Sequence, residues 1–143
     1  MIQLLNGIQQ TSSALQAEKL RMEVISQNIA NAHVTSGPDG KAYQRQQVVF
    51  ESLLQEQTGG ALPGSAPASV QVARIIKDTS APKQVYNPHH PAANADGMVS
   101  MPNVDVYREM VDMMSATRAY EANLAVVKNA RTMAMQALSI GKR

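Results

Sequence analysis

Between residues 103 and 143, apolar side chains recur at alternating steps of four and three residues. This spacing is the seam of a single long helix that packs lengthwise on another helix. Asn103, directly after Pro102, is a good N-cap residue, and Gly141 is suited to end the helix. The span exceeds the roughly 25 residues of an ordinary globular helix, so a partner helix is needed. The seam consists of Val106, Met110, Met113, Tyr120, Leu124, Val127, Ala134 and Leu138, and only Thr117 and Arg131 interrupt it.

A second helix is predicted over about residues 1–31, where apolar residues fall at a seven-residue spacing. A strict seven-residue repeat keeps one row facing a partner helix. Asn28 and Asn31 mark the end of the helix, because Pro38 cannot extend it and Gly37 offers a positive φ. The row consists of Ile8, Leu15, Met22 and Ile29, and Leu4, Leu5 and Ile25 broaden it.

The segment between the two helices favours short strands. β-branched and aromatic residues predict strands at about residues 44–53 and 70–77, and a short third strand at residues 98–101. Asp39-Gly40 and Asp96-Gly97 are turn dipeptides, and residues 59–67 form a loop rich in Gly, Pro, Ala and Ser. Three prolines predict that residues 79–95 run extended over a surface without long regular structure.

The predicted fold is therefore mainly α with a small β-rich insert. Its long N- and C-terminal helices are expected to pair as a coiled-coil-like hairpin. The chain divides into an N-terminal helix for assembly and export (residues 1–35), a β-rich insert with loops (36–101) and a long C-terminal helix (102–143). An insert of about 60 residues is marginal as a separate folding unit.

Composition excludes several classes of function. Aromatic residues make up 3% of the chain, so a compact core is thin, and the net charge of +2 comes from scattered basic residues without a nucleic-acid patch. The absence of Cys excludes disulfides and thiolate metal sites. No apolar run reaches the ~18 residues of a membrane span, and the N-terminus lacks the features of a secretory signal peptide. We expect no nucleic-acid binding and no stable membrane insertion. Export, if it occurs, needs no cleaved signal peptide.

Two clusters of polar residues have side chains suited to chemistry. His89-His90 is an adjacent pair in a proline-flanked turn, which favours a solvated turn over a metal site. Asp105, Glu109 and Asp112 share one helix face near a helix start, where a solvated or partner-facing role is expected rather than acid–base catalysis. We therefore predict no catalytic residue, no metal and no cofactor.

The sequence does resemble a known family. The run from Ser26 to Ala32, Ser-Gln-Asn-Ile-Ala-Asn-Ala, resembles the N-terminal signature of flagellar axial proteins. The later runs Tyr-Asn-Pro-His-His-Pro-Ala-Ala (86–93), Met-Pro-Asn-Val (101–104) and Arg-Ala-Tyr-Glu-Ala-Asn (118–123) look like the flagellar basal-body rod protein family, most closely its proximal-rod members. The residues that carry the resemblance are Asn28, Asn31, Asn87, Pro88, His90, Pro91, Pro102, Asn103, Arg118, Tyr120 and Asn123.

This resemblance implies a structural subunit of a rod that crosses the periplasm and transmits torque from motor to hook. It implies export through the flagellar type III apparatus with an uncleaved N-terminal region. The implied partners are other copies of the chain, other rod proteins, the export apparatus and the ring proteins that surround the rod. It also implies terminal segments that become ordered only on assembly.

We expect the seven-residue row of the first helix to pack on the seam of the second, and the remaining apolar edges to meet neighbouring subunits. The expected assembly interface is Leu4, Leu5, Ile8, Leu15, Met22, Ile25, Ile29, Val106, Met110, Val111, Met113, Met114, Tyr120, Leu124, Val126, Val127 and Leu138. The alternative left open is a soluble helical adaptor or chaperone-like binding protein, which would stay monomeric or dimeric. A small enzyme is disfavoured because no residue constellation resembles an active site.

Overall fold

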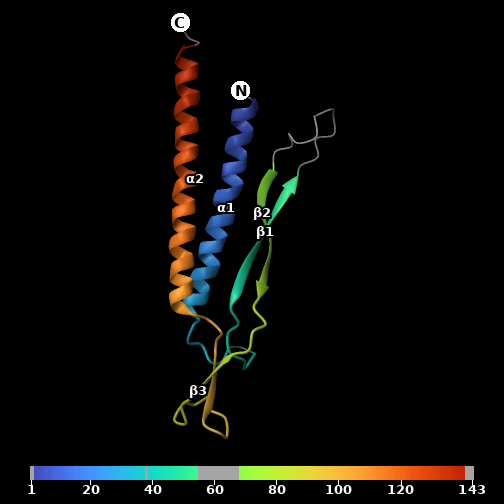
Figure 1. The fold of residues 1–143 in the computed structure, drawn as a ribbon, viewed down its shortest axis with the longest axis vertical. Coiled ribbons are helices and arrows are strands. Elements are labelled where there is room, and N and C mark those ends of the chain that lie inside the picture. Colours follow the sequence, from blue (N-terminus) through green and yellow to red (C-terminus); the bar gives the residue numbers. More distant parts are fainter. Residues whose placement is uncertain (1, 38, 55–67, 141–143) are drawn as a thin grey trace.

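Two long helices form the frame of the computed structural model. Helix α1 (Ile2–Ala30) and helix α2 (Val106–Ile140) lie side by side and run in opposite directions (Figure 1). The structure describes residues 2–37, 39–54 and 68–140, without the side chains of residues 2–6, 52–54 and 68–69. Leu4, Leu5, the loop at residues 59–67 and the stop at Gly141 therefore lie outside the description. The predicted class, mainly α with a small β-rich insert, is confirmed.

The first turn of α2 begins later than predicted. Asp105, not Asn103, caps the helix: its Oδ1 accepts a hydrogen bond from the amide of Tyr107 at 3.1 Å, and its carbonyl accepts one from the amide of Glu109 at 2.9 Å. The predicted N-cap was wrong because the side chain of Asn103 is used elsewhere: its Oδ1 accepts the Arg45 amide at 2.9 Å. Both residues are good capping types, and only tertiary contacts decide between them.

The covered side of α2 is displaced from part of the predicted seam. Met110, Leu124 and Leu138 are exposed, so the prediction that they pack on α1 was wrong. Glu109 and Ala116 are buried instead, and Asn123 and Ala130 continue their seven-residue spacing in a half-buried state. Glu109 takes the first of these positions because it makes a buried ionic contact at the start of α2. The later positions carry small or polar residues, which allow α1 and α2 to approach closely. The other part of the seam, Met113, Tyr120, Val127 and Ala134, is half-buried.

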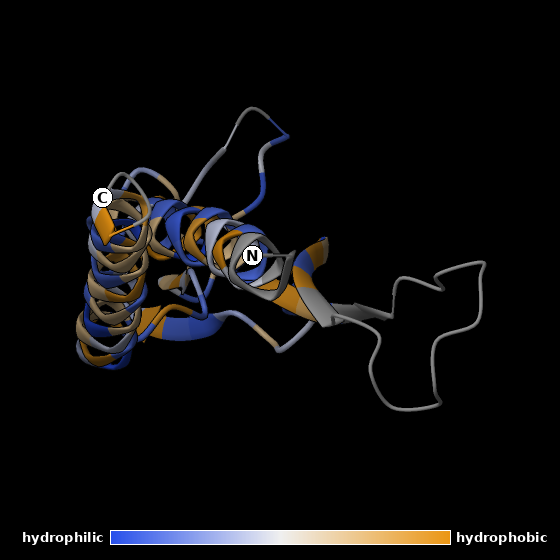
Figure 2. Cartoon of the chain, turned by 90° about the horizontal axis from the view of Figure 1, so that it is seen from above, coloured by the Kyte–Doolittle hydropathy of each residue, from blue (hydrophilic) through white to orange (hydrophobic). Residues whose placement is uncertain are grey.

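Helix α1 is the middle layer of the molecule. Strand β1 (Gln46–Leu54) pairs antiparallel with strand β2 (Ala68–Lys77), with a register shift between Val49 and Phe50. This β1–β2 ribbon packs on α1, and α2 packs on another side of α1, so the three elements lie in a row (Figures 1 and 2). The predicted strands at 44–53 and 70–77 are confirmed to within two residues at each end.

Two faces of α1 explain why it can occupy the middle. The Met22 Sδ atom lies 3.7 Å from the Thr117 hydroxyl, so the face that carries the seven-residue row meets α2. The second face meets the ribbon. Ala17 and Val24 are buried, and Ala17 and Leu20 line a groove of about 320 Å³ between α1 and β2. Sequence reasoning found the first face and missed the second, because Ser13, Gln16 and Ala17 do not form a bulky apolar stripe.

The second β unit lies beyond the end of the helix pair. Strand β3 (Lys83–Tyr86) pairs antiparallel with strand β4 (Met98–Met101). Strand β4 was predicted, and β3, four residues long, falls in the segment predicted to have no long regular structure. Pro82 and Pro88 stand outside β3, so they do not interrupt the pairing. The predicted turns are confirmed by positive φ at Gly40 (68°) and Gly97 (73°).

Candidate assembly surfaces

A buried carboxylate lies at the base of the helix pair. Glu109 has 1% of its surface exposed, and its Oε1 accepts a hydrogen bond from Arg45 Nε at 2.6 Å. Its Oε2 accepts another from Asn28 Nδ2 at 2.9 Å. The prediction that this carboxylate is solvated or partner-facing was therefore wrong. An ionised buried carboxylate needs both a counter-ion and hydrogen-bond donors, and here one comes from the insert and one from α1.

Asn28 satisfies its whole side-chain amide at the same place. Its Nδ2 donates to Glu109 and to the Gln46 carbonyl at 2.8 Å. Its Oδ1 accepts from the Tyr43 hydroxyl and from the Gln46 amide, each at 2.9 Å. The amide group thus pairs with both backbone groups of the first residue of β1, as a neighbouring strand would. All four hydrogen-bonding positions are used, so the 1% exposure of Asn28 leaves no polar group unpaired.

The backbone of Arg45 ties in two further segments. Its amide donates to Asn103 Oδ1 at 2.9 Å, and its carbonyl accepts from the Asp78 amide at 2.7 Å. We call Asn28, Tyr43, Arg45, Asn103 and Glu109 the polar junction. It joins α1, the start of β1, the end of β2 and the start of α2, which are up to 81 residues apart in sequence. It fixes where the insert sits on the helices.

Electrostatics at the polar junction agree with this arrangement. Burial raises the pKa of Tyr43 above its usual value of 10.0, and the negative charge of Glu109 raises this pKa further. Next to the junction, hydrogen bonds from the hydroxyl and the amide of Ser80 lower the pKa of Asp78. Tyr43 therefore donates as a neutral phenol, and the Asp78 carboxyl stays ionised at neutral pH.

The residues that carry the family resemblance fall in four places. Asn28 and Asn103 belong to the polar junction, and Pro102 is buried beside it. Four others lie in the loop between β3 and β4, where His90 Nδ1 accepts the Ala92 amide at 3.1 Å. Asn31 donates only to the carbonyl of Gln27 within its own helical turn. The loop residues are Asn87, Pro88, His90 and Pro91, and the remaining three, Arg118, Tyr120 and Asn123, stand along the middle of α2.

The two histidines of this turn differ in their surroundings. The ring of His90 accepts a backbone hydrogen bond that shapes the turn, and His89 is exposed. Among the residues that the structure describes, no group of three or more His, Asp or Glu side chains could hold a metal ion.

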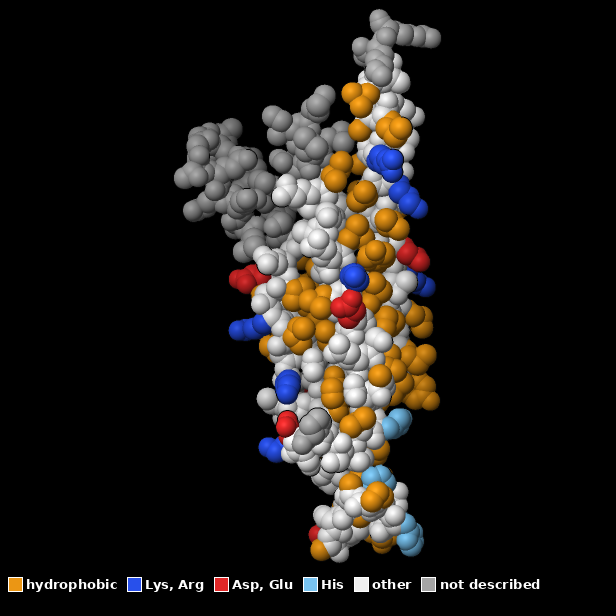
Figure 3. Space-filling model, turned by 180° about the vertical axis from the view of Figure 1, so that it is seen from behind, with side chains coloured by type: hydrophobic (Ala, Val, Ile, Leu, Met, Phe, Trp, Pro, Cys, Tyr) orange, Lys and Arg blue, Asp and Glu red, His pale blue; other side chains and the backbone are white. Residues whose placement is uncertain are grey.

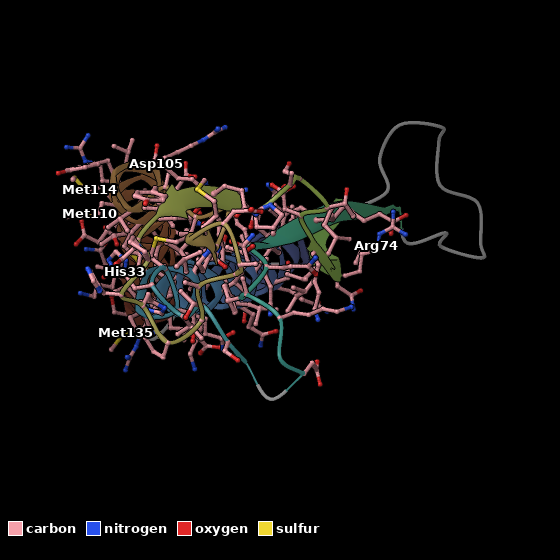
Figure 4. All side chains as sticks on the ribbon, turned by 90° about the horizontal axis from the view of Figure 1, so that it is seen from below. His33, Arg74, Asp105, Met110, Met114 and Met135 are labelled. Atoms are coloured by element: carbon pink, nitrogen blue, oxygen red, sulfur yellow. The ribbon has the colours of Figure 1, made fainter. Side chains whose placement is uncertain are left out.

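Apolar side chains are exposed on α2 and on the β1–β2 ribbon. On the first turns of α2, Tyr107, Met110, Val111 and Met114 form the α2 patch, which points away from the β1–β2 ribbon (Figure 4). On the ribbon, Phe50, Val70 and Ile75 are exposed on the face that lines grooves against α1, and Ile76 is exposed on the other face; together we call these four residues the ribbon patch. Figure 3 shows hydrophobic side chains gathered along α2 and most densely near its lower end. Exposed apolar patches of this kind mark surfaces for other proteins.

The expected interface residues are divided by these surfaces. Met110, Val111 and Met114 belong to the α2 patch, and Leu124, Val126 and Leu138 are exposed farther along the helix. Ile25 is buried inside the subunit, so it is not accessible to a partner in this structure. Ile8, Leu15, Met22, Ile29, Val106, Met113, Tyr120 and Val127 are half-buried.

Sequence reasoning missed the residues that position these surfaces. Arg45 and Tyr43 had no periodic pattern to mark them, and Glu109 was assigned to a solvated face. One signal in the sequence could have indicated the polar junction: Asn28 lies next to apolar residues at the end of the first helix. A buried Asn requires several hydrogen-bond partners. The ribbon patch was missed because the spacing of apolar residues in the two strands was not assigned to faces.

Within the described residues, neither helix is long and apolar enough to cross a membrane.

Comparisons with known proteins agree along the chain. A family model described as flagella basal body rod protein matches residues 8–38, and one described as flagellar basal body rod FlgEFG protein C-terminal matches residues 95–140. The chain is 42% identical to flagellar basal-body rod protein FlgC of Salmonella typhimurium, over 97% of this chain and 98% of the relative. It is 41% identical to the protein of the same name in Bacillus subtilis (92% and 94% covered) and 40% identical to that of Borreliella burgdorferi (96% and 97% covered).

Proposed function

The chain belongs to the FlgC family of flagellar basal-body rod proteins, and we propose that it builds the proximal part of the rod through contacts between its helices. It is a structural subunit of the basal-body rod and not an enzyme. Similarity to FlgC proteins at about 40% identity over nearly the whole chain is the observation that carries this conclusion. The adaptor alternative is not favoured.

The exposed apolar patches support helical assembly. The α2 patch and the ribbon patch have different shapes, one a helix surface and one a strand surface. Two different surfaces that fit each other make a heterologous contact, and such contacts propagate as a filament when the rotation between copies does not close. The chain then assembles with its own copies and with other rod proteins, and the rod transmits torque from motor to hook.

The three segments of the chain have separate roles in this proposal. Residues 1–35 serve assembly and export through the flagellar type III apparatus, without a cleaved signal peptide. Residues 36–101 form the insert that faces neighbouring subunits and the surrounding ring proteins. Residues 102–143 pack on the N-terminal helix as a coiled-coil-like hairpin, supported by the alternating half-buried positions of α2. The assembled rod crosses the periplasm.

A charge between α1 and α2 tests the proposal. We expect Met22→Asp or Val127→Asp to abolish incorporation into basal bodies while the protein is still made, because both side chains are half-buried in the helix pair. Incorporation is measured by immunoblot of purified basal bodies, and motility by swimming in soft agar. Asn129→Asp adds the same charge at an exposed position nearby and should leave both unchanged. Normal motility of both test variants would contradict the proposal.

Far-UV circular dichroism with limited proteolysis of the dilute purified chain addresses the adaptor alternative. We expect helix content below that of the 29 and 35 residues of α1 and α2, and rapid cleavage near the chain ends, because the terminal segments become ordered only on assembly, whereas the polar junction holds the rest of the fold together. A protease-resistant, fully helical monomer would favour the adaptor.

A further inference from the structure

Four methionine side chains are exposed in the described part of the chain, and all of them lie on α2. The two in the α2 patch, Met110 and Met114, are 48% and 55% exposed. They are one helical turn apart, so they share one face of the helix, and both point away from the ribbon (Figure 4). Met113, on the same turn, is half-buried. The other two exposed methionines, Met133 and Met135, lie near the end of α2.

The composition of the chain makes exposed thioethers its first targets for peroxides. A peroxide transfers an oxygen atom to sulfur, and the two side chains that contain sulfur are those of Cys and Met. The chain has nine Met and no Cys. An oxidant therefore reacts with Met, and it reacts first with exposed sulfur atoms because it must contact the sulfur to transfer oxygen.

Contacts within the subunit keep Met110 and Met114 on the outside. Glu109, the residue before Met110, is 1% exposed and accepts hydrogen bonds from Arg45 and Asn28. These hydrogen bonds fix the rotation of the first turns of α2 about the helix axis. Neither thioether can turn inward without breaking them, so the exposure of both is a property of the folded chain.

Taking the proposed rod function as given, we propose that Met110 and Met114 form a modification site for peroxides, and that their oxidation to sulfoxides in the unassembled chain prevents its entry into the rod. A lone pair of each sulfur attacks one oxygen of hydrogen peroxide, and the O–O bond breaks. A proton then moves from the oxygen on sulfur to the departing hydroxide, which leaves as water. Each sulfur loses two electrons and each peroxide gains two, so no other reactant is consumed.

Oxidation changes half of the α2 patch from apolar to polar. The patch has four residues, and a sulfoxide is polar where a thioether is apolar. Covering it with an apolar surface of a neighbouring subunit leaves its oxygen without a hydrogen-bond donor, which costs free energy. A neighbour that already covers the patch shields both sulfur atoms, so oxidation acts on the chain before assembly. Methionine sulfoxide reductases reverse the reaction, so the block is reversible.

Peptide mass spectrometry tests the site on the purified full chain. The chain is treated with hydrogen peroxide for increasing times and digested with trypsin, which cuts after Arg108 and Arg118. The resulting peptide contains Met110, Met113 and Met114, so fragment ions report three rates under identical conditions. We expect Met110 and Met114 to gain oxygen several-fold faster than Met113, which is the internal control. Equal rates for the three residues would overturn the site.

The effect on assembly is tested in a host that lacks its own FlgC. Synthesis of the chain is induced in the presence of hydrogen peroxide, and the amount in purified basal bodies is measured by immunoblot. We expect peroxide to lower the incorporation of the natural chain several-fold. Met110→Leu with Met114→Leu keeps an apolar patch of similar volume without sulfur, so incorporation should be resistant to peroxide. The matched control, Met133→Leu with Met135→Leu, should stay as sensitive as the natural chain.

A polar substitution tests the consequence without an oxidant. Met110→Gln with Met114→Gln makes the same two positions polar, and this variant should fail to enter basal bodies in untreated cells. Circular dichroism of the purified variant should match that of the natural chain, because both side chains are exposed.

Three results would overturn the inference about assembly. The first is normal incorporation of the Gln variant, and the second is equal sensitivity of the natural chain and the Met110→Leu, Met114→Leu variant to peroxide. The third is resistance of the Met133→Leu, Met135→Leu variant, which would place the sensitive site elsewhere on α2. In each of these cases the untreated natural chain still enters basal bodies and restores swimming. If the untreated natural chain does neither, the proposed function itself fails.

Discussion

The polar junction and the α2 patch meet at the first turns of α2, but they differ in whether their side chains find partners within the chain. At the junction, the carboxylate of Glu109 and the amide of Asn28 are 1% exposed, and each polar atom has a partner within the chain. One residue further along, Met110 is 48% exposed and no described residue covers it. The polar junction therefore satisfies its buried polar groups within the chain, whereas the α2 patch leaves its apolar groups uncovered.

This difference separates folding from assembly. A charged side chain that becomes buried when the subunit folds must be paired within the subunit, because an unpaired buried charge is very costly in free energy. An exposed apolar side chain costs less free energy and can stay exposed until a neighbouring subunit binds. Binding then contributes about 25 cal/mol for each Å² of apolar area that is removed from water. We infer that the junction sets the shape of each subunit and that the two patches provide the free energy of association.

The largest expected effect follows from breaking the ion pair. Arg45→Met should lower the free energy of unfolding by about 3–5 kcal/mol, because Glu109 is left as a buried charge without its cation. The measurement is urea unfolding of the purified chain followed by circular dichroism. Adding Glu109→Gln should recover part of the loss, since it removes the charge and keeps the shape. A loss below about 0.5 kcal/mol for Arg45→Met would show that the junction does not hold the fold together.

A smaller loss is expected from removing the amide of Asn28. Asn28→Ala should cost about 1–3 kcal/mol, because the Tyr43 hydroxyl and the backbone of Gln46 lose their partner. Asn31→Ala is the matched control; that side chain bonds only to its own helical turn and is less buried. Equal losses for the two variants would mean that the junction contributes no more than a helix end.

The junction also predicts a response to alkaline pH. The pKa of Tyr43 is raised in the folded chain, so the folded state holds the phenol proton more tightly than the unfolded state does. This contribution to stability is complete below pH 10.0 and is lost as the pH rises from 10.0 through the folded pKa. Unfolding measured between pH 8 and 11 should show a steeper decline for the natural chain than for Tyr43→Phe. Parallel curves would contradict the role given to this tyrosine.

The smallest effect is expected at the α2 patch in the isolated chain. Val111→Ser should change the free energy of unfolding by less than about 0.5 kcal/mol, because Val111 is 64% exposed. The same substitution should reduce incorporation into basal bodies, where a neighbour covers the patch. Thr132→Ser, at an exposed position on the same helix, should affect neither measurement. A large loss of stability for Val111→Ser would remove the distinction between the two regions.

Periodicity in the sequence was sufficient for the elements with local causes. The two long helices, the turns at Gly40 and Gly97 and strand β4 follow from spacing, turn residues and β-branched runs close together in the chain. The runs at residues 26–32 and 86–93 were sufficient for the family. Strand β3 was not predictable in this way, because its residues Lys83 and Gln84 acquire strand geometry only by pairing with β4.

The sequence alone thus determined that two amphipathic helices flank a small β-rich insert and that the chain is a rod-family subunit. Tertiary structure decided which row of α2 is covered, which residue caps that helix and where Glu109 goes. Adjacent rows on a helix are equivalent in spacing, and Asn103 and Asp105 are equivalent in capping chemistry. Only the arrival of Arg45 and Asn28 from distant segments distinguishes these choices, because a buried carboxylate is stable only where its partners meet.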